Sequence, residues 1–333
     1  MSNKLYKFIC LILVSSLPIL YPCISLPQME IRSKDPEFYY KIGTTHFDQG
    51  DDDQAILYFN KTLEINPNDA KAYFSRGRAF SKKKEYDQAI SNYTQALELN
   101  PKYVDAYNNR GFIYNQKGEY SRALSDFNKA LEIDPRHIAA YMNRGITYSL
   151  REQYDQAIDE YTKVIEINPR FVAAYYNRGA VYRKWGEFNH AISDYTKALE
   201  MDQKHFMAYN NRGVVYGIIG KYEEAISDFN KAIEINPKYV DAYSNRGTLH
   251  CEKGKYDEAL SDYNRIIEIN PKDGFAYFGR GHAYYLKDEY DKCLSDMNKA
   301  QELGYPITPE FLEELLEVLE RQKLEKGHNH FNQ

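Results

Sequence analysis

Prolines recur at a fixed spacing along most of the chain, and this spacing constrains the fold more than any other sequence feature. They stand at positions 67, 101, 135, 169, 237 and 271, so that successive gaps are 34, 34, 34, 68 and 34 residues. The double gap skips position 203, which holds Gln203. A period of 34 residues is typical of stacked helical hairpins, in which each repeat packs only against its neighbours.

Phased on these prolines, the chain contains eight repeats of 34 residues. The repeats cover residues 36–69, 70–103, 104–137, 138–171, 172–205, 206–239, 240–273 and 274–307. Each begins with a helical pattern that carries Tyr at its fourth position and Gly at its eighth, as in Tyr107 and Gly111. Glycine inside a helix costs about 1 kcal/mol relative to alanine. Its return in every repeat therefore predicts a close helix crossing at this point.

A second helical pattern completes each repeat after a turn such as Gly118-Glu119-Tyr120. A small residue is followed four positions later by an aromatic residue and three positions further by an aliphatic one, as in Ala157, Tyr161 and Val164. This spacing is typical of the buried stripe of an amphipathic helix. Most repeats then end in Asn-Pro or Asp-Pro, where proline cannot continue the helix.

This pattern resembles the tetratricopeptide repeat family over residues 36–307. The resemblance implies an all-α fold, a right-handed superhelical solenoid of eight helix-turn-helix repeats. It also implies that the first helices line the concave side of the solenoid.

A further helix is predicted after the last repeat, because Thr308 and Pro309 favour a helix start. Its apolar residues form one stripe: Phe311, Leu312, Leu315, Leu316 and Leu319. We expect residues 308–325 to form a capping helix over the last repeat, with a dimerising helix as the alternative. Residues 326–333 are expected to form a tail.

The N-terminus has the pattern of a targeting segment. Lys4 and Lys7 precede an apolar run that begins at Phe8, and the small residue Ser25 marks a cleavage site. We expect residues 1–25 to be a signal peptide, followed by a linker over residues 26–35. The alternative is an uncleaved membrane anchor, because residues 8–24 reach the short end of a spanning helix. The protein is therefore expected in the periplasm or cell envelope, with secretion or membrane anchoring as alternatives.

Charge and motifs exclude several function classes. The net charge of −5 is mildly acidic and argues against nucleic acid as a partner, because nucleic-acid binding needs a concentrated basic face. The chain lacks a Gly-rich phosphate loop with lysine, an H-E-x-x-H motif and a G-x-S-x-G motif. His328 and His330 offer too few ligands for a metal. We therefore predict a protein that is not an enzyme, with no catalytic, cofactor-binding or metal-binding residues.

Arginine precedes the repeat glycine in seven repeats, and an acid stands sixteen residues after it in six of them. The acids are Asp126, Glu160, Asp194, Asp228, Asp262 and Asp296. In the first repeat, Ile42 and Tyr58 occupy these two positions, so the arginine and the acid are lost together. We predict an Arg–carboxylate bridge between the two helices of a repeat. The alternative is a basic ladder open to acidic ligands.

The residue before that arginine is asparagine in five consecutive repeats. These ladder asparagines are Asn109, Asn143, Asn177, Asn211 and Asn245. Helical geometry turns them away from the hairpin core, and the family resemblance places them on the concave wall. There they look like the asparagine ladder of O-linked N-acetylglucosamine transferases, in which amides grip an extended peptide. Because an amide both donates and accepts hydrogen bonds, we predict the same role here. The alternative is that asparagine only suits the stacking of repeats.

Other residues at predicted concave positions indicate which side chains the bound peptide would carry. Six apolar or aromatic residues form the middle of the predicted groove: Met142, Ile146, Tyr176, Met207, Val214 and Ile218. Lys71, Arg78 and Lys82 of the second repeat make its start basic. The carboxylate clamp of some relatives is absent, because Phe74 and Phe112 occupy two of its positions.

We therefore predict a protein–protein interaction scaffold of the cell envelope that binds extended or unfolded segments of other proteins in its concave groove. One alternative is the substrate-recruiting subunit of a separate enzyme. Another is a secreted, host-directed factor built from the same repeats.

Overall fold

The computed structural model describes residues 35–331 of the chain, with side chains up to residue 322. The predicted signal or anchor segment and residues 26–34 of the linker lie outside the described residues. The described part consists of helices and the loops between them. It forms two compact units, one ending at Asn143 and the other beginning at Arg144.

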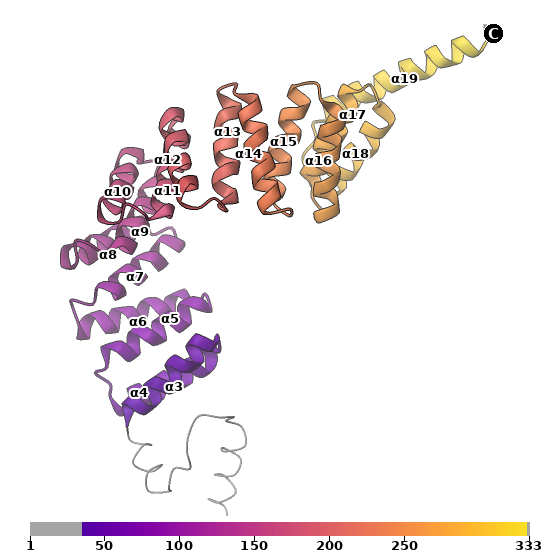
Figure 1. Cartoon of the computed structure of the whole chain (residues 1–333). Coiled ribbons are helices and arrows are strands. Elements are labelled where there is room, and N and C mark those ends of the chain that lie inside the picture. The colour runs from indigo at the N-terminus through magenta and orange to yellow at the C-terminus, as the bar shows by residue number, and fades with distance from the viewer. Residues whose placement is uncertain (1–34, 332–333) are drawn as a thin grey trace, which may run out of the picture. The chain divides into compact units, whose positions relative to one another are not determined.

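Sixteen helices follow one another as eight pairs, and a further helix ends the described chain (Figure 1). The first helices of the pairs are α3 (Pro36–Gln49), α5 (Ala70–Lys82), α7 (Val104–Gln116), α9 (Ile138–Leu150), α11 (Val172–Trp185), α13 (Phe206–Ile218), α15 (Val240–Glu252) and α17 (Gly274–Leu286). The second helices are α4 (Asp52–Ile65), α6 (Tyr86–Leu99), α8 (Tyr120–Ile133), α10 (Tyr154–Ile167), α12 (Phe188–Met201), α14 (Tyr222–Ile235), α16 (Tyr256–Ile269) and α18 (Tyr290–Glu302). Each first helix begins at the first residue of a predicted repeat, and the all-α fold class is confirmed.

Asparagine or aspartate after the second helix shapes the turn to the next repeat. The side-chain oxygen of Asn100 accepts a hydrogen bond from the backbone N–H of Lys102 at 3.1 Å. Asp202 accepts in the same way from Lys204 at 2.9 Å. Such a turn competes with continuation of the helix. It ends α12 at Met201 without a proline, so Gln203 leaves the 34-residue period intact.

The glycine at the eighth position allows the two helices of a repeat to approach closely. A β-carbon on Gly213 would lie 2.8 Å from a ring carbon of Phe229, and one on Gly77 would lie 2.8 Å from Tyr93. Both rings are buried, with 2% and 1% of their surface exposed. The close crossing predicted from the sequence is confirmed, and the neighbour is an aromatic ring of the second helix in seven repeats and Met297 in the eighth.

The buried rings also join each repeat to the next. Ala225 and Phe229 of α14 are buried together with Leu249 of α15, which belongs to the following repeat. Ala89 and Tyr93 of α6 pack in the same way with Ile113 of α7. A single pair of helices would leave one side of its ring exposed. The repeats therefore share their cores, and each one depends on its neighbour.

The last repeat is covered by α19 (Pro309–Phe331). Leu315 and Leu319 of α19 are buried against Cys293 and Met297 of α18. Phe311 and Leu312 are partly buried at the same place, whereas Leu316 is 48% exposed. Most of the predicted stripe therefore packs on the last helix pair.

The same helix is longer than the sequence predicts. It continues through Gly327 to Phe331, where a tail was expected from residue 326. Glycine weakens a helix by about 1 kcal/mol but keeps its backbone N–H, so it does not end the helix by itself. Residues 332 and 333 lie outside the described residues.

Two glycines of α13 provide a test of this packing. We expect Gly213→Ala to destabilise the protein by about 1–3 kcal/mol, because its methyl group meets Phe229. We expect Gly217→Ala to stabilise it by up to about 1 kcal/mol, since a β-carbon there has no neighbour within 4 Å. Urea unfolding followed by circular dichroism measures both. Equal effects of the two changes would contradict the proposed contact.

Candidate functional site

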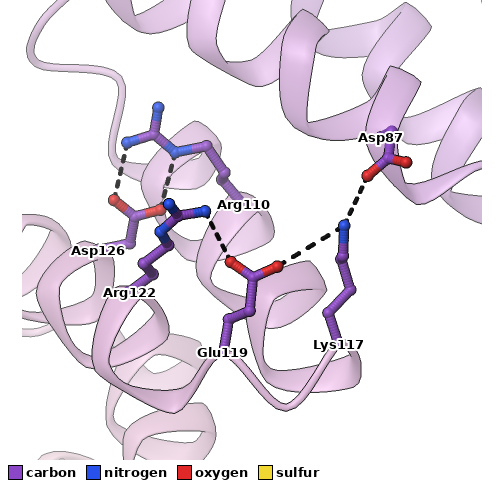
Figure 2. A network of polar contacts seen from close by, with 6 residues as sticks. All are labelled: Asp87, Arg110, Lys117, Glu119, Arg122 and Asp126. Atoms are coloured by element: carbon purple, nitrogen blue, oxygen red, sulfur yellow. Dashed lines mark hydrogen bonds and ion pairs between the residues drawn. The ribbon is translucent and has the colours of Figure 1, made fainter.

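The arginine before the repeat glycine is paired with an acid of the second helix. In Figure 2, Arg110 donates from Nε and Nη2 to the two carboxylate oxygens of Asp126, each at 2.8 Å. The same pairing through two hydrogen bonds recurs as Arg178–Asp194, Arg212–Asp228, Arg246–Asp262 and Arg280–Asp296. Arg144 makes one such bond to Glu160 at 2.9 Å. The predicted bridge within a repeat is confirmed.

These bridges are largely shielded from solvent. The side chains of Arg178 and Asp194 are 18% and 7% exposed. Hydrogen bonding to Asp194 raises the pKa of Arg178. Because each of these arginines is occupied by an internal acid, the geometry argues against the alternative of a basic ladder open to acidic ligands.

Arginines at this position also join a repeat to the one before it. Nη1 of Arg178 donates to the hydroxyl of Thr162 at 2.8 Å, and Nη1 of Arg110 donates to Thr94 at 2.9 Å. The acceptor lies sixteen residues before the arginine, on the preceding second helix. The acceptors of this contact include Asn60, Thr94, Thr162, Thr196, Asn230 and Asn264. The contact is missing from the sequence prediction, although recurrence of Thr or Asn at one position signalled it.

A lysine in the turn makes a parallel contact at the surface. Nζ of Lys117 lies 2.6 Å from a carboxylate oxygen of Asp87 in the preceding repeat and 3.6 Å from one of Glu119 (Figure 2). Asp87 is 84% exposed. Solvent screens such a pair, so it adds little to stability.

The ladder asparagines are half-buried on the first helices. Three of them donate from Nδ2 to the preceding repeat: Asn143 to Asn108 at 2.9 Å, Asn211 to the Tyr176 hydroxyl at 3.0 Å, and Asn245 to Asn210 at 2.9 Å. The partner always lies 35 residues earlier, which the sequence prediction missed. These bonds connect successive first helices, as the stacking alternative requires. Nδ2 carries two hydrogens, so Asn211 and Asn245 each keep one N–H for a further partner.

Asn109 and Asn177 differ in sequence, because the residues 35 positions before them are Phe74 and Met142, which have no side-chain oxygen to accept a hydrogen bond. Asn109 accepts instead from Nδ2 of Asn108 at 3.2 Å. No hydrogen bond joins the Asn177 amide to another residue that the structure describes. Asn177 therefore retains its full capacity to donate and accept.

Apolar side chains remain exposed beside these amides in the compact unit that begins at Arg144. Ile146, Met207 and Ile218 are 37%, 40% and 56% exposed. Tyr176 and Val214 are half-buried on the neighbouring faces of α11 and α13. In the other compact unit, Met142 is half-buried.

The three basic residues predicted for the start of the groove are exposed on α5. The guanidinium of Arg78 lies 4.5 Å from the ring centre of Phe47, and Nζ of Lys82 lies 4.3 Å from it. Lys82 also donates to the backbone oxygen of Phe47 at 3.2 Å. Arg78 and Lys82 thus pack on an aromatic ring of the preceding repeat. Lys71 is exposed as well.

Within residues 35–322, no group of three or more His, Cys, Asp or Glu side chains is placed to hold a metal ion. Cys251 and Cys293 are buried free thiols. Burial raises the pKa of Cys251 to about 11 and that of Cys293 to about 12. Both thiols are therefore protonated near neutral pH and act as small core residues.

None of the helices in the described region combines enough length with enough apolar character to cross a bilayer. Residues 8–24, the predicted anchor, lie outside this region.

Family models match most of the repeat region. The model for the tetratricopeptide repeat matches residues 36–69, 104–137, 172–205, 206–239 and 240–273, which together make up just over half of the chain. A second model with this description matches residues 58–91 and 127–159, and a TPR repeat model matches residues 77–118 and 150–186. No curated protein matches the chain with significance.

Several solved structures are similar to this chain. A tetratricopeptide repeat protein from Parabacteroides merdae aligns with 75% of this chain and 98% of its own, with a TM-score of 0.58 and 23% identity. The pilF structure of Pseudomonas aeruginosa aligns with 64% of this chain and 97% of its own, with a TM-score of 0.55 and 18% identity. A chain of the APC/C hetero-tetramer Cut9-Hcn1 aligns with 85% of this chain and 56% of its own, with a TM-score of 0.57 and 18% identity. At these identities the similarity establishes the fold alone.

A double-mutant cycle on Arg178 and Asp194 tests the bridge. Each single change to leucine strands a shielded charge and is expected to cost about 1–3 kcal/mol of unfolding free energy. The double change should cost less than the sum, because no unpaired charge remains. Denaturant melts of the four proteins measure the coupling. The matched control is a double-mutant cycle on Lys197 and Glu200, an exposed pair on α12, the helix of Asp194. It should show no coupling energy within error.

Proposed function

The chain belongs to the tetratricopeptide repeat family, and on that premise we propose that it is a non-catalytic scaffold that binds extended segments of other proteins. Stacked repeats of this kind form long surfaces for protein–protein interaction. We assign the binding surface to the first helices α11, α13 and α15, which follow one another in the compact unit that begins at Arg144.

One observation carries this proposal, namely the exposure of apolar side chains beside incompletely used amides on α13. Met207 and Ile218 are 40% and 56% exposed, and Asn211 between them in the sequence keeps one amide N–H. Exposed apolar groups gain free energy when a partner covers them. A backbone without secondary structure of its own needs hydrogen-bond partners, which amides supply.

The neighbouring helices α11 and α15 also carry ladder asparagines with unused hydrogen-bonding capacity. Asn177 on α11 makes no hydrogen bond to another described residue, and Asn245 on α15 uses only one N–H. The three amides therefore differ in what they offer an incoming backbone. Asn177 can use both N–H groups and the oxygen of its amide, whereas Asn211 and Asn245 have already used one N–H in a bond to the preceding repeat. The sequence of the bound segment would be selected by its side chains against Met207, Val214 and Ile218.

We also propose that the scaffold acts outside the cytoplasm, in the periplasm or cell envelope. The support is the N-terminal pattern of Lys4, Lys7 and the apolar run that begins at Phe8. An extracytoplasmic scaffold would meet segments of exported proteins before or after they fold.

Site-specific crosslinking tests the assigned surface. A photoreactive residue in place of Asn177 should form adducts with a partner protein in the producing cells. Introducing Met207→Asp and Ile218→Asp should lower the adduct yield about tenfold or more, because a charge then faces the apolar part of the ligand. Adducts are measured by mass shift on gels and identified by mass spectrometry.

The matched control is Leu99→Asp, which alters a residue of α6 with 39% exposure, close to the 40% of Met207. It should leave the yield unchanged. A second control places the photoreactive residue at Leu57 of α4, which is 43% exposed. Equal adducts from positions 177 and 57, or an undiminished yield in the aspartate variants, would refute the assignment.

Cell fractionation and N-terminal sequencing test the location. We expect the mature protein to begin near Leu26 and to fractionate with the periplasm, because the signal pattern ends at Ser25. Replacing Lys4 and Lys7 with glutamate should cause the precursor to accumulate in the cytoplasm. Full-length wild-type protein found in the cytoplasm would contradict export.

A further inference from the structure

The fifth repeat carries an arginine where the second repeat has a small hydroxyl residue. In the second repeat, the hydroxyl of Tyr93 on α6 interacts with Ser81 of α5 and with Asn109 of the next repeat. The equivalent positions one hundred and two residues later hold Tyr195, Arg183 and Asn211. Around this tyrosine the two repeats differ at position twelve of the first helix, Ser81 or Arg183, and at position five, Phe74 or Tyr176.

This difference leaves polar atoms without partners. The Asn211 amide donates to the Tyr176 hydroxyl at 3.0 Å. The Tyr195 hydroxyl and Nε of Arg183 are both buried without a hydrogen bond of good geometry to the described residues, and the Tyr195 hydroxyl interacts instead with the Arg183 guanidinium. The whole Tyr195 side chain is buried, with 0% exposed. Buried polar atoms without partners are uncommon in folded proteins, and such atoms often mark a binding site.

Arg183 lies close to two tyrosines. Burial raises the pKa of Tyr195 to about 12, and both the positive charge of Arg183 and its hydrogen-bonding interaction with the Tyr195 hydroxyl oppose this shift. Burial also raises the pKa of Tyr176, where the Asn211 hydrogen bond and the Arg183 charge act in the opposite direction. The two tyrosine rings are centred 6.0 Å apart. Both hydroxyls are therefore protonated donors near neutral pH, and both lie near the same guanidinium.

No acid of the protein neutralises this guanidinium among the residues that the structure describes. Asp194 is the nearby acid that acts on Tyr195, but its two oxygens accept from Arg178 at 2.8 Å. Arg183 takes part in no ion pair within the described region, and it is half-buried on α11. Its charge thus remains uncompensated beside the assigned peptide surface.

The available groups are all hydrogen-bond donors. Arginine has only N–H groups. The Tyr176 hydroxyl already accepts from Asn211, so it has its own proton to donate. The Tyr195 hydroxyl also has a proton to donate. Donors around one cation favour a ligand that brings acceptors and negative charge, and a carboxylate does both in a geometry that matches guanidinium.

We propose that Arg183, Tyr195 and Tyr176 form a carboxylate subsite, which binds the side chain of an Asp or Glu within an extended protein segment. This inference rests on the proposed function, because it assigns one residue of the segment that the first helices bind. Met207 and Val214 of α13 belong to the next repeat, so the residues beside the acid in the segment are expected to be apolar. The subsite uses other positions than the carboxylate clamp of some relatives, which this chain lacks.

Peptide binding tests the subsite directly. The probes are short peptides of serine and leucine, blocked at both ends, with glutamate, glutamine or lysine at the centre. Fluorescence anisotropy should show the glutamate peptide binding about tenfold more tightly than the glutamine peptide, as charge-assisted hydrogen bonds require. Arg183→Ser should abolish this preference. Tyr195→Phe should reduce it.

The chain itself indicates that these variants fold. Serine already occupies position twelve at Ser81 and Ser149, and phenylalanine occupies the position of Tyr195 at Phe59, Phe127 and Phe229. The matched control is Lys184→Ser, which removes the same charge from the exposed neighbour of Arg183. It should preserve the preference for glutamate. An equal loss in Lys184→Ser and Arg183→Ser would overturn the subsite in favour of general charge attraction.

A second measurement decides the subsite even if the groove binds none of these peptides. Glutarate is titrated into protein with labelled arginine side chains, and the Nε–H resonance of Arg183 is assigned from its absence in Arg183→Ser. A saturable shift of this resonance, reduced in Tyr195→Phe, supports the subsite. Absence of a shift with glutarate overturns it, whether or not the peptides bind. If the peptides bind equally, the proposed groove still stands without the subsite.

Discussion

The contact between a glycine of the first helix and an aromatic ring of the second is the constraint on which the repeats depend. At Gly213 and Phe229 there is no room for a β-carbon, so the ring packs closely against its partner helix. The buried face of the ring then reaches the next repeat, as Phe229 does at Leu249. Because every repeat crosses its helices at the same point, the same packing can continue along the chain. The shared core of neighbouring repeats follows from this contact.

The arginines add directional bonds to this apolar packing. Arg178 bonds to Asp194 within its repeat and to Thr162 in the repeat before it. The carboxylate, the guanidinium and the hydroxyl come from three different helices, so their geometry is satisfied only when the stacking is correct. A shielded ion pair contributes little net stability when compared with apolar groups of the same size. We infer that these arginines chiefly specify how one repeat sits on the next.

Positions on the first helices show that stacking and binding use the same side chains. Asn211 and Asn245 bond to the preceding repeat, whereas Asn177 does not bond to any described residue. A ladder that is uniform in sequence is therefore not uniform in its chemistry. Differences at neighbouring positions decide which amide remains available. The same reasoning applies to Arg183, whose position holds serine in two other repeats.

The sequence by itself determined the repeat phase, the helix pairs, the close glycine crossing and the Arg–acid bridges. Each of these rests on contacts within one hairpin, such as Arg178 with Asp194, so the regularities of one chain reveal them. Tertiary structure alone decided that Asn211 bonds to Tyr176 and that Tyr195 and Arg183 keep unpaired atoms. These outcomes depend on which side chain of a stacked neighbour comes within about 3 Å of a given atom. Repeat periodicity places the positions side by side, but hydrogen-bond geometry and burial decide which groups meet.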